Sequence, residues 1–231
     1  MQVGTAAPVE TEKANGPRSP KGVQTRARLV EAGKKVFEED GFLEARISDI
    51  AERAGLSHGS FYHYFESKEE IFREVAAAVD ERLSAPLNNV ILDPSSTAPP
   101  HERIHEAIRR HLGSYRQDAR IMGVIEQVSR YDEQVRAVRL ARHRRYSQQI
   151  ADSIRQLQRR GMADQRLDPA IAASGLGAMT DRFAEMWLVQ GFLQCRFDDA
   201  VDQLTLLYMN ALELKADDDT EVTRARRQRA Q

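Results

Sequence analysis

A chain of 231 residues, 41% apolar and 30% charged, is long enough to bury the core of one large or two small domains. Its net charge of −1 gives no overall basic field, so any affinity for nucleic acid has to come from locally placed cations and helix ends. The single cysteine, Cys195, excludes an intrachain disulfide and a cysteine-rich metal site. With no segment near the ~20 apolar residues of a membrane span and no apolar signal core, we expect a cytoplasmic protein.

Residues 1–22 are rich in Pro, Gly, Ser, Thr and charge, which predicts a disordered arm. Cations recur along this arm and into the next segment, which would suit an electrostatic tether or a finger in the minor groove of DNA. A solvated tail explains the same composition equally well. The cations are Lys13, Arg18, Lys21, Arg26 and Arg28.

The first helix is predicted within residues 25–42, TRARLVEAGKKVFEEDGF, where apolar residues recur at helical spacing up to Gly41. Leu29, Val36 and Phe37 form the apolar stripe. Gly33 lies in the same stripe and costs about 1 kcal/mol of helix propensity, unless close packing needs the space.

Residues 46–65 predict two short helices joined by a tight turn. Ala51 adds little bulk where the helices cross, and Gly55 tolerates a positive φ at the corner. Ser57 can accept hydrogen bonds from the backbone that opens the second helix, expected over His58–Tyr64. Phe61, Tyr64 and Phe65 supply its apolar side. This is the pattern of a helix-turn-helix.

The other side of the second helix carries imidazoles, hydroxyls and a phenol, which suit contacts to phosphates and base edges in a major groove. These groups belong to His58, Ser60, Tyr62 and His63. Lys68 follows at the start of a third amphipathic run. A small helical hairpin with a polar solvent face would show the same local pattern, because short motifs recur by chance.

The segment from Val23 to Leu83 resembles the DNA-binding domain of the TetR family of bacterial transcriptional regulators. The resemblance lies in VFEEDGF, DIAERAG, LSHGSFYHYF and SKEEIF. It implies an all-α fold, with a three-helix DNA-binding domain over residues 23–83 and a helical effector-binding and dimerisation domain over residues 84–214. It also implies a homodimer that binds a roughly palindromic operator as a repressor and releases it when a small molecule enters the C-terminal domain. Residues 215–231 lack an apolar period and predict a disordered tail.

The resemblance also implies which residues contact DNA. Ser48 matches a position that touches phosphate or a base, Tyr62 and His63 match an aromatic pair, and Lys68 matches a phosphate-binding lysine. The chain departs from the family at Ala45-Arg46, where a hydroxyl usually caps the second helix; its loss costs about 1 kcal/mol, although Arg46 can offer phosphate a charged hydrogen bond. The predicted DNA-binding set is Arg46, Ser48, Ser57, His58, Gly59, Ser60, Tyr62, His63, Tyr64 and Lys68.

The proline-rich stretch Leu92–Pro100 predicts a loop, and helical patterns follow as far as Leu214. A long helix is expected from about Asp132 to Arg160, ending at Gly161. Five of its arginines alternate with acidic and glutamine neighbours, which favours a solvated face over a DNA-binding patch. They are Arg136, Arg139, Arg142, Arg144 and Arg145.

The last two helices, residues 169–191 and 197–214, carry more apolar surface than a thin monomer can cover, so we expect a symmetric four-helix dimer interface. The resemblance puts the dimer contact on the same helices. Alternatively, both belong wholly to the core of one chain. The predicted interface residues are Ala172, Leu176, Met179, Phe183, Val201, Leu204 and Tyr208.

A mostly apolar effector pocket is expected in the C-terminal domain, lined by large, adaptable side chains. The candidates are Tyr115, Met122, Tyr146, Phe183 and Trp187, each of which could equally be plain core. Because no polar cluster is visible in the sequence, a hydrophobic or aromatic ligand is favoured.

His101, Glu102 and His105 match the HExxH pattern of zinc hydrolases. The motif follows two prolines at the start of a helix and has no evident third ligand, so an exposed helix start is the better interpretation. No nucleophile elbow or phosphate-binding loop stands out. We therefore expect no catalytic residue, metal or cofactor. The alternatives are this zinc hydrolase and a non-specific DNA-binding or protein-interaction module.

Overall fold

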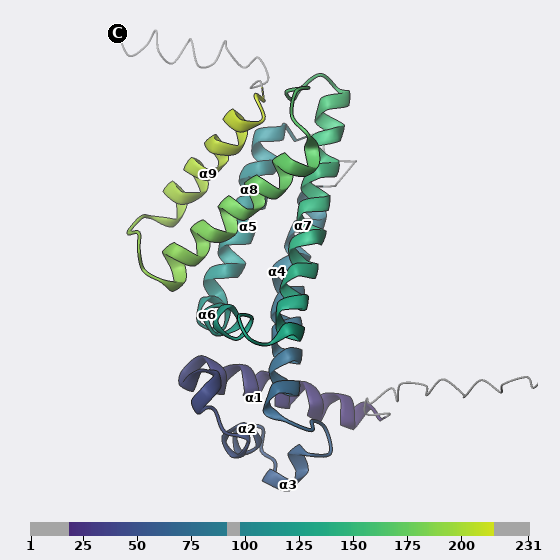
Figure 1. Ribbon diagram of the computed structural model, residues 1–231, viewed down its shortest axis with the longest axis vertical. Helices are drawn as coiled ribbons and strands as arrows, with labels where there is room; N and C mark the ends of the chain where they lie inside the picture. The colour runs from purple at the N-terminus through teal and green to yellow at the C-terminus, as the bar shows by residue number, and fades with distance from the viewer. Residues whose placement is uncertain (1–18, 92–97, 215–231) are drawn as a thin grey trace, which may run out of the picture.

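The computed structural model describes residues 19–91 and 98–214, which form helices and no strand. A small helical unit lies at one end of an elongated molecule and a larger helical bundle at the other (Figure 1). This arrangement confirms the predicted all-α class. The predicted arm lies outside the described residues up to position 18, as do residues 92–97 and the predicted tail.

The bounds of the helices follow the capping signals in the sequence. Asp132 accepts from the N–H groups of Gln134 and Val135, and Asp168 caps the helix after it in the same way. The elements are α1 Pro20–Glu44, α2 Ile47–Arg53, α3 His58–Phe61, α4 Lys68–Ile91, α5 Pro100–Gln117, α6 Ala119–Val128, α7 Glu133–Arg159, α8 Pro169–Ala184, a π-helical turn Glu185–Val189, and α9 Phe197–Ala211.

Helix α1 begins at Pro20, three residues before the predicted start of the domain, because Ser19 accepts a hydrogen bond from the N–H of Gly22 and caps it. Gly41, with φ 73°, interrupts the helical geometry at the predicted place. Gly33 is closely packed: a Cβ there would lie 3.2 Å from Cδ1 of Ile71 on α4. The space left by the missing side chain therefore brings α1 and α4 together.

The N-terminal unit is built on a cluster of aromatic rings. The rings of Phe37 and Phe72 meet edge to face with centroids 4.9 Å apart, and Phe42 contacts Phe72 at the same distance. Ile50 and Phe61, from α2 and α3, are fully buried in the same core. The short helices thus hold their positions through apolar anchors on α1 and α4.

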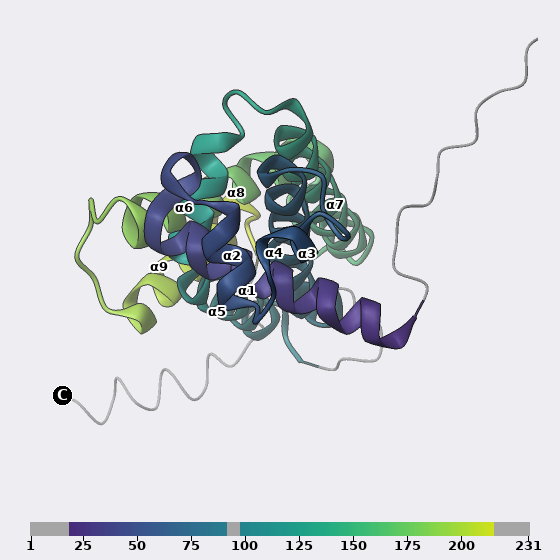
Figure 2. The ribbon, with the colours of Figure 1, turned by 90° about the horizontal axis from the view of Figure 1, so that it is seen from below.

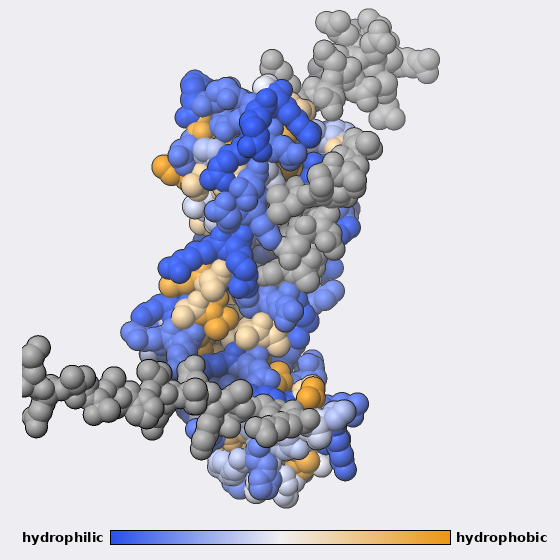
Figure 3. All heavy atoms as spheres, turned by 90° about the vertical axis from the view of Figure 1, so that its right-hand side faces the viewer, coloured by the Kyte–Doolittle hydropathy of each residue, from blue (hydrophilic) through white to orange (hydrophobic). Residues whose placement is uncertain are grey.

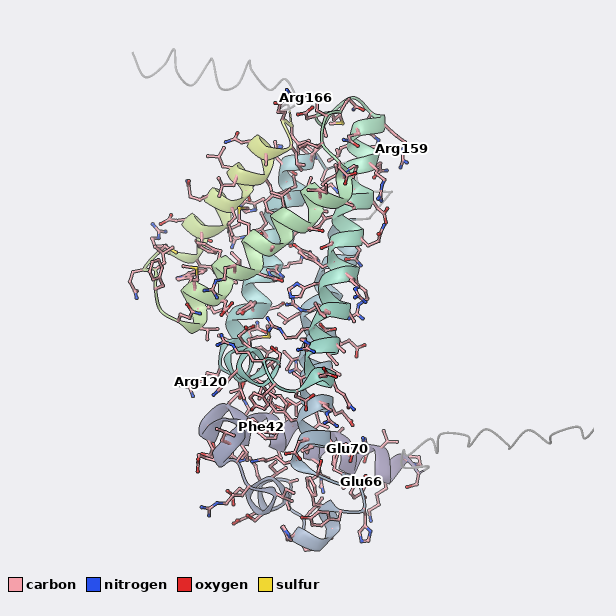
Figure 4. All side chains as sticks on the ribbon, viewed as in Figure 1. Phe42, Glu66, Glu70, Arg120, Arg159 and Arg166 are labelled. Carbon is pink, nitrogen blue, oxygen red and sulfur yellow. The ribbon has the colours of Figure 1, made fainter. Side chains whose placement is uncertain are left out.

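Helix α4 belongs to both parts of the molecule. It packs against α1 at one end and against α5 and α7 at the other (Figure 1). Ser67 and Glu70 start it: the Ser67 hydroxyl accepts from the N–H of Glu70, and the Glu70 carboxylate accepts from the N–H of Glu66 at 2.5 Å (Figure 4). The predicted domain boundary after residue 83 falls inside this continuous helix.

In the C-terminal bundle, α8 packs on α7 and α9 packs on α5. Seen from the N-terminal end, α1 to α3 lie in front of this bundle (Figure 2). Hydrophilic side chains cover most of the face on the α7 side, apart from an apolar area near its middle (Figure 3). The outward arginines of α7, among them Arg136, Arg144 and Arg145, agree with the predicted solvated face.

The predicted dimer interface needs correction on α9. Val201, Leu204 and Tyr208 are buried within a single chain, with at most 5% of their surface exposed. Because α9 packs along α5, its apolar stripe fills the monomer core, and the assignment of these residues to the dimer contact is wrong. Leu176 of α8 is buried as well. The remaining candidates, Ala172, Met179 and Phe183, are half-buried.

Candidate nucleic-acid interface and ligand cavities

The turn between α2 and α3 has the predicted geometry. Gly55 has φ 69° at the corner, and the Ser57 hydroxyl accepts from the N–H of Ser60 at 3.2 Å. Helix α3 is shorter than expected: it ends at Phe61, and the next residues form a turn with hydrogen bonds from His63 to Ser60 and from Tyr64 to Phe61. Each of these hydrogen bonds joins residues three apart in the sequence, whereas an α-helix joins residues four apart, so the chain turns more tightly here.

An exposed ridge follows this short helix, which we define by His58, Gly59, Tyr62 and His63. Tyr62 leaves half of its surface accessible, and its ring meets that of His58 edge to face at 5.4 Å. Phe61, at the base of the ridge, is fully buried. The ridge therefore presents two imidazoles and a phenol on a rigid apolar anchor.

The other predicted DNA-binding residues differ in exposure. Arg46, Ser48 and Ser57 are exposed, whereas Ser60 and Tyr64 are half-buried. Ser60 shares a hydrogen bond between hydroxyls with Ser57 at 2.8 Å. Exposed polar groups thus lie both at the start of α2 and along α3.

Lys68, the first residue of α4, connects that helix to the end of α1. Its ammonium group donates to the carbonyls of Leu43 and Ala45, at 2.9 and 3.0 Å, and lies 4.9 Å from the centre of the Phe42 ring. Two of its three donors therefore stabilise the loop after α1. This structural role was not visible in the sequence, where Lys68 stands 25 residues from Leu43.

Arg26 is not an arm cation, contrary to the expectation from its place in the basic segment. Its guanidinium stacks 4.1 Å above the Phe65 ring, donates to the carbonyl of Tyr64 and pairs with Glu74 of α4. Because α1 starts at Pro20, the side chain of Arg26 faces the helix-turn-helix core and supports the turn after α3. Lys21 and Arg28 remain exposed on the same helix.

Ion pairs join the N-terminal unit to the bundle. Lys34 of α1 lies 3.1 Å from Asp118, which precedes α6, and Arg73 of α4 lies 3.1 Å from Asp132, which precedes α7. Burial lowers the pKa of Lys34, but Glu38 and Asp118 outweigh this effect and raise its pKa overall. The joint is therefore charged, paired and largely screened from solvent.

An apolar cavity of about 270 Å³ lies between α5, α7 and α9. Its lining contains aliphatic side chains from α5 and α7, Leu212 directly after α9, and two phenols, those of Tyr146 and Tyr208. The Tyr208 hydroxyl lies 2.9 Å from that of Thr180 and is hydrogen bonded to Tyr146. Burial raises the pKa of Tyr208 to about 12, so both phenols remain protonated at neutral pH.

A second, polar cavity of about 810 Å³ lies between α7 and α8. Tyr115, Met122 and Tyr146, three of the residues predicted for an effector pocket, line it. Phe183 and Trp187 line neither cavity: their rings pack on one another at 5.7 Å, and Trp187 packs on Phe197 at 6.3 Å. They pack beside the π-helical turn, outside these two cavities, and their role in an effector pocket stays a prediction.

A buried ionic cluster forms one wall of the polar cavity. Arg142 of α7 lies between two carboxylates, 3.3 Å from Asp80 of α4 and 3.4 Å from Asp181 of α8. His111 and His143 approach the same Asp181 at 2.9 and 3.0 Å. The Tyr146 ring stacks on His111, with centroids 5.6 Å apart.

This cluster corrects two expectations. Arg142 is only 6% exposed, so it does not belong to the solvated face of α7, and Arg139 is half-buried beside Glu126. A polar cluster is also present beside the candidate pocket. It was missed because its members come from four helices and are far apart in the sequence. In the sequence, the adjacent charged residues Asp181 and Arg182 within a mostly apolar helix were the indication that a charged group is buried here.

The HExxH residues form no metal site. His105 lies 3.1 Å from Asp202 of α9, and His101 is 4.0 Å from Glu102. Across residues 19–91 and 98–214, no group of three or more potential metal ligands comes together. In the same ranges, no helix combines the length and apolar character needed to cross a bilayer.

Comparison with known families gives two matches along the chain. A model described as bacterial regulatory proteins, tetR family, matches residues 29–75, and one described as tetracyclin repressor-like, C-terminal domain, matches residues 97–191. The uncharacterized HTH-type transcriptional regulator YdgC of Bacillus subtilis is 38% identical over 73 residues, 32% of this chain and 37% of YdgC. The HTH-type transcriptional repressor KstR2 of Mycobacterium tuberculosis is 36% identical over 93 residues, 37% of this chain and 45% of KstR2. The matches thus span less than half of these relatives.

Solved structures share the fold over most of the chain. The fatty acid degradation regulator FadR from Bacillus halodurans has a TM-score of 0.67 at 18% identity, covering 86% of this chain and all of that one. The TetR family transcriptional regulator PfmR from Thermus thermophilus has a TM-score of 0.64 at 21% identity, covering 82% and 100%. The solved structures show the fold, and the two family models, over residues 29–75 and 97–191, show that the chain belongs to the TetR family of bacterial regulatory proteins.

Proposed function

We propose that the protein is a DNA-binding transcriptional repressor that acts as a homodimer and is released from its operator by a small molecule. The exposed ridge on α3 carries this proposal. The side chains of His58, Tyr62 and His63 are exposed and present hydrogen-bond donors and ring faces to the solvent. Phe61 and Phe65 are buried beneath them and anchor the backbone. Such a rigid polar ridge fits the width of a major groove. The relative named a transcriptional repressor supports repression as the direction of control.

The proposed contacts fall into two groups. Arg46, Ser48 and Ser57, exposed around α2 and the turn, suit phosphate oxygens, with Arg46 providing the charged contact. Tyr62 and His63 suit bases or sugar edges. The set proposed to face DNA is Arg46, Ser48, Ser57, His58, Gly59, Ser60, Tyr62, His63, Tyr64 and Lys68.

We place the dimer contact on the outward sides of α8 and α9, where large apolar side chains remain accessible. Ile171 is 74% exposed, and Leu206 and Leu207 are about half exposed. Burying these residues against a second copy would remove apolar area from water. A two-fold dimer would present two α3 ridges to successive major grooves, about 34–36 Å apart.

The effector is proposed to act through α4. The buried cluster gives a physical connection: Tyr146 borders both cavities and stacks on His111, which meets Asp181, and Arg142 links Asp181 to Asp80 on α4. A ligand that moves Tyr146 would disturb this chain of contacts and tilt α4 with the attached α3. The ligand shifts the protein only as far as it prefers one arrangement over the other.

The test begins with selection of bound sequences from a random duplex library, followed by titration of the selected duplex and a scrambled one. Tyr62→Ala is expected to weaken binding to the selected duplex by about fivefold or more, since a base contact is worth about 1–3 kcal/mol. Tyr131→Ala is the matched control, because Tyr131 is similarly exposed, at 56% against 50% for Tyr62, but lies between α6 and α7. Sedimentation checks that both variants keep the assembly state of the parent.

Equal affinity for selected and scrambled duplexes at every salt concentration would support the rival, a non-specific DNA-binding module. An unchanged affinity of the Tyr62→Ala variant would remove the ridge from the interface.

A further inference from the structure

The turn that follows α3 carries much of the exposed ridge. Helix α3 ends at Phe61, so Tyr62 and His63 lie in the turn, where the N–H groups of His63 and Tyr64 donate to carbonyls three residues before them. A helix of four residues followed by such a turn is too short to fix its own orientation. Contacts from other helices must therefore hold these two exposed side chains in place.

Arg26 of α1 makes such contacts through a single planar group. Its Nη1 donates to the Tyr64 carbonyl in the turn, and the guanidinium lies 4.1 Å from the centre of the Phe65 ring. Its Nε donates to Glu74 of α4 at 3.2 Å, and its Nη2 donates to the second oxygen of the same carboxylate. One side chain thus joins the turn, the buried ring beneath the turn and α4.

The guanidinium of Arg26 is occupied by these contacts within the chain. Each of its three nitrogens donates a hydrogen bond, and the side chain is only 20% exposed. Arginine alone supplies a fork for a carboxylate, a donor for a carbonyl and a flat face for a ring, because the lysine ammonium is a compact point charge. The contacts therefore depend on the shape of this group as well as on its charge.

We propose that Arg26 is a positioning residue for DNA recognition: it holds Tyr62 and His63 in the orientation that meets the duplex and does not contact DNA itself. The proposal rests on the proposed function, because it assigns a role within the same DNA-binding surface. A residue that acts through the ridge affects binding to the selected duplex, whereas a phosphate contact affects every duplex alike. Arg28, two residues further along α1, is exposed and offers a cation on the same helix for comparison.

The test titrates the full chain with the selected duplex and the scrambled one at several salt concentrations. Arg26→Lys keeps the charge and should weaken binding to the selected duplex about fivefold, comparable with the loss of one base contact. Its affinity for the scrambled duplex and its salt dependence should stay as in the parent. Arg28→Gln, the matched control, removes a charge and should leave the ratio of the two affinities unchanged. If Arg26→Lys also leaves this ratio unchanged, the proposal is overturned.

Two further variants separate positioning from direct contact. Glu74→Gln removes the charge that Arg26 pairs with on α4 and should lower the same ratio, although the loss of a negative charge would by itself tighten binding to both duplexes. When Arg26→Lys is combined with Tyr62→Ala, the loss should be smaller than the product of the two single losses, because both act through the same contact. Single losses that multiply in full would make Arg26 an independent contact and refute the positioning role.

Hydrogen exchange in the free protein gives a readout that involves no DNA. The N–H groups of Tyr64 and Phe65 donate to the Phe61 carbonyl at 2.9 and 3.1 Å. They should exchange about tenfold faster in Arg26→Lys than in the parent or in Arg28→Gln, because the turn opens more often. Circular dichroism and sedimentation check that the variants keep the helical content and assembly state of the parent.

The two proposals fail in different ways. A parent chain that does not prefer the selected duplex would refute the sequence-specific regulator, and the exchange rates would still decide whether Arg26 holds the ridge. Specific binding by the parent that Arg26→Lys retains in full, with unchanged exchange, would refute the positioning role alone.

Discussion

Replacing Asp181 with asparagine tests the buried ionic cluster. The side chains of Asp181 and Arg142 are 11% and 7% exposed, and the Asp181 carboxylate also contacts the rings of His111 and His143. Removing one partner of a buried ion pair usually costs 3–5 kcal/mol, because the other charge stays buried. Arg142 keeps Asp80 at 3.3 Å, so the lower end applies. We expect a loss of about 3 kcal/mol at pH 7, which lowers the melting temperature by roughly 6–12 °C in a chain of this length.

The pH dependence gives this prediction a second readout. Burial alone would raise the pKa of Asp181, but Arg142, His111 and His143 outweigh it and hold the pKa well below its ordinary value. The ionised form is therefore favoured by folding, and its contribution is complete above the ordinary pKa of about 3.9. It fades as the pH falls toward the lower pKa of the folded state. The difference between parent and variant should therefore be smaller below pH 4 than at pH 7.

Urea unfolding followed by circular dichroism, at one fixed protein concentration, measures the difference. Asp152→Asn serves as the control, because Asp152 is half exposed on α7 and pairs with Arg155 at 2.6 Å on the surface. That change should stay within about 0.5 kcal/mol. If Asp181→Asn costs no more than the control, or its effect does not vary below pH 4, the cluster does not stabilise the fold as argued.

Three further changes test other parts of the molecule by the same unfolding assay. Lys68→Met loses two charge-assisted hydrogen bonds to Leu43 and Ala45 and should lower the free energy of unfolding by about 1–2 kcal/mol. The control Lys35→Met, at a half-exposed side chain, should lower it by less than about 0.5 kcal/mol. Equal effects would show that the Lys68 hydrogen bonds do not stabilise the fold. Gly123→Ala places a Cβ 2.9 Å from Cγ1 of the stiff Val189 side chain and should destabilise the chain. In a Val189→Ala background the same change should instead stabilise by up to about 1 kcal/mol through helix propensity, and an unchanged sign would show that the contact is not limiting. Ser57→Ala removes the cap of α3 and should cost about 1 kcal/mol, and a neutral result would mean that the turn does not depend on the cap.

The sequence predicts local structure well where a single residue decides it. Gly55 turns the chain, Ser57 caps α3 and Asp168 caps α8, and each does so through atoms within three residues of itself. The exposed ridge on α3 follows from the same local periodicity. These features need no knowledge of the rest of the molecule.

Features that depend on distant partners were missed. Arg142 looks like one of several surface arginines until α4 and α8 bring Asp80 and Asp181 to it. Leu204 and Tyr208 lie on an apolar stripe that the sequence alone assigns to a dimer interface. In the structure, this stripe is buried because α9 packs on α5 of the same chain. An amphipathic pattern shows that a face is covered and does not show by what.

The continuity of α4 constrains how this protein can change in length. Each residue added to or deleted from an α-helix turns everything beyond it by about 100° and moves it by about 1.5 Å. A single-residue deletion between Val79 and Leu83 would swing the N-terminal unit away from the bundle and separate Lys34 from Asp118. Substitutions along α4 can be absorbed one by one, whereas an insertion or deletion would have to come in whole turns. Chimeras that graft a different DNA-binding unit onto this bundle must therefore keep the phase of α4 across the junction.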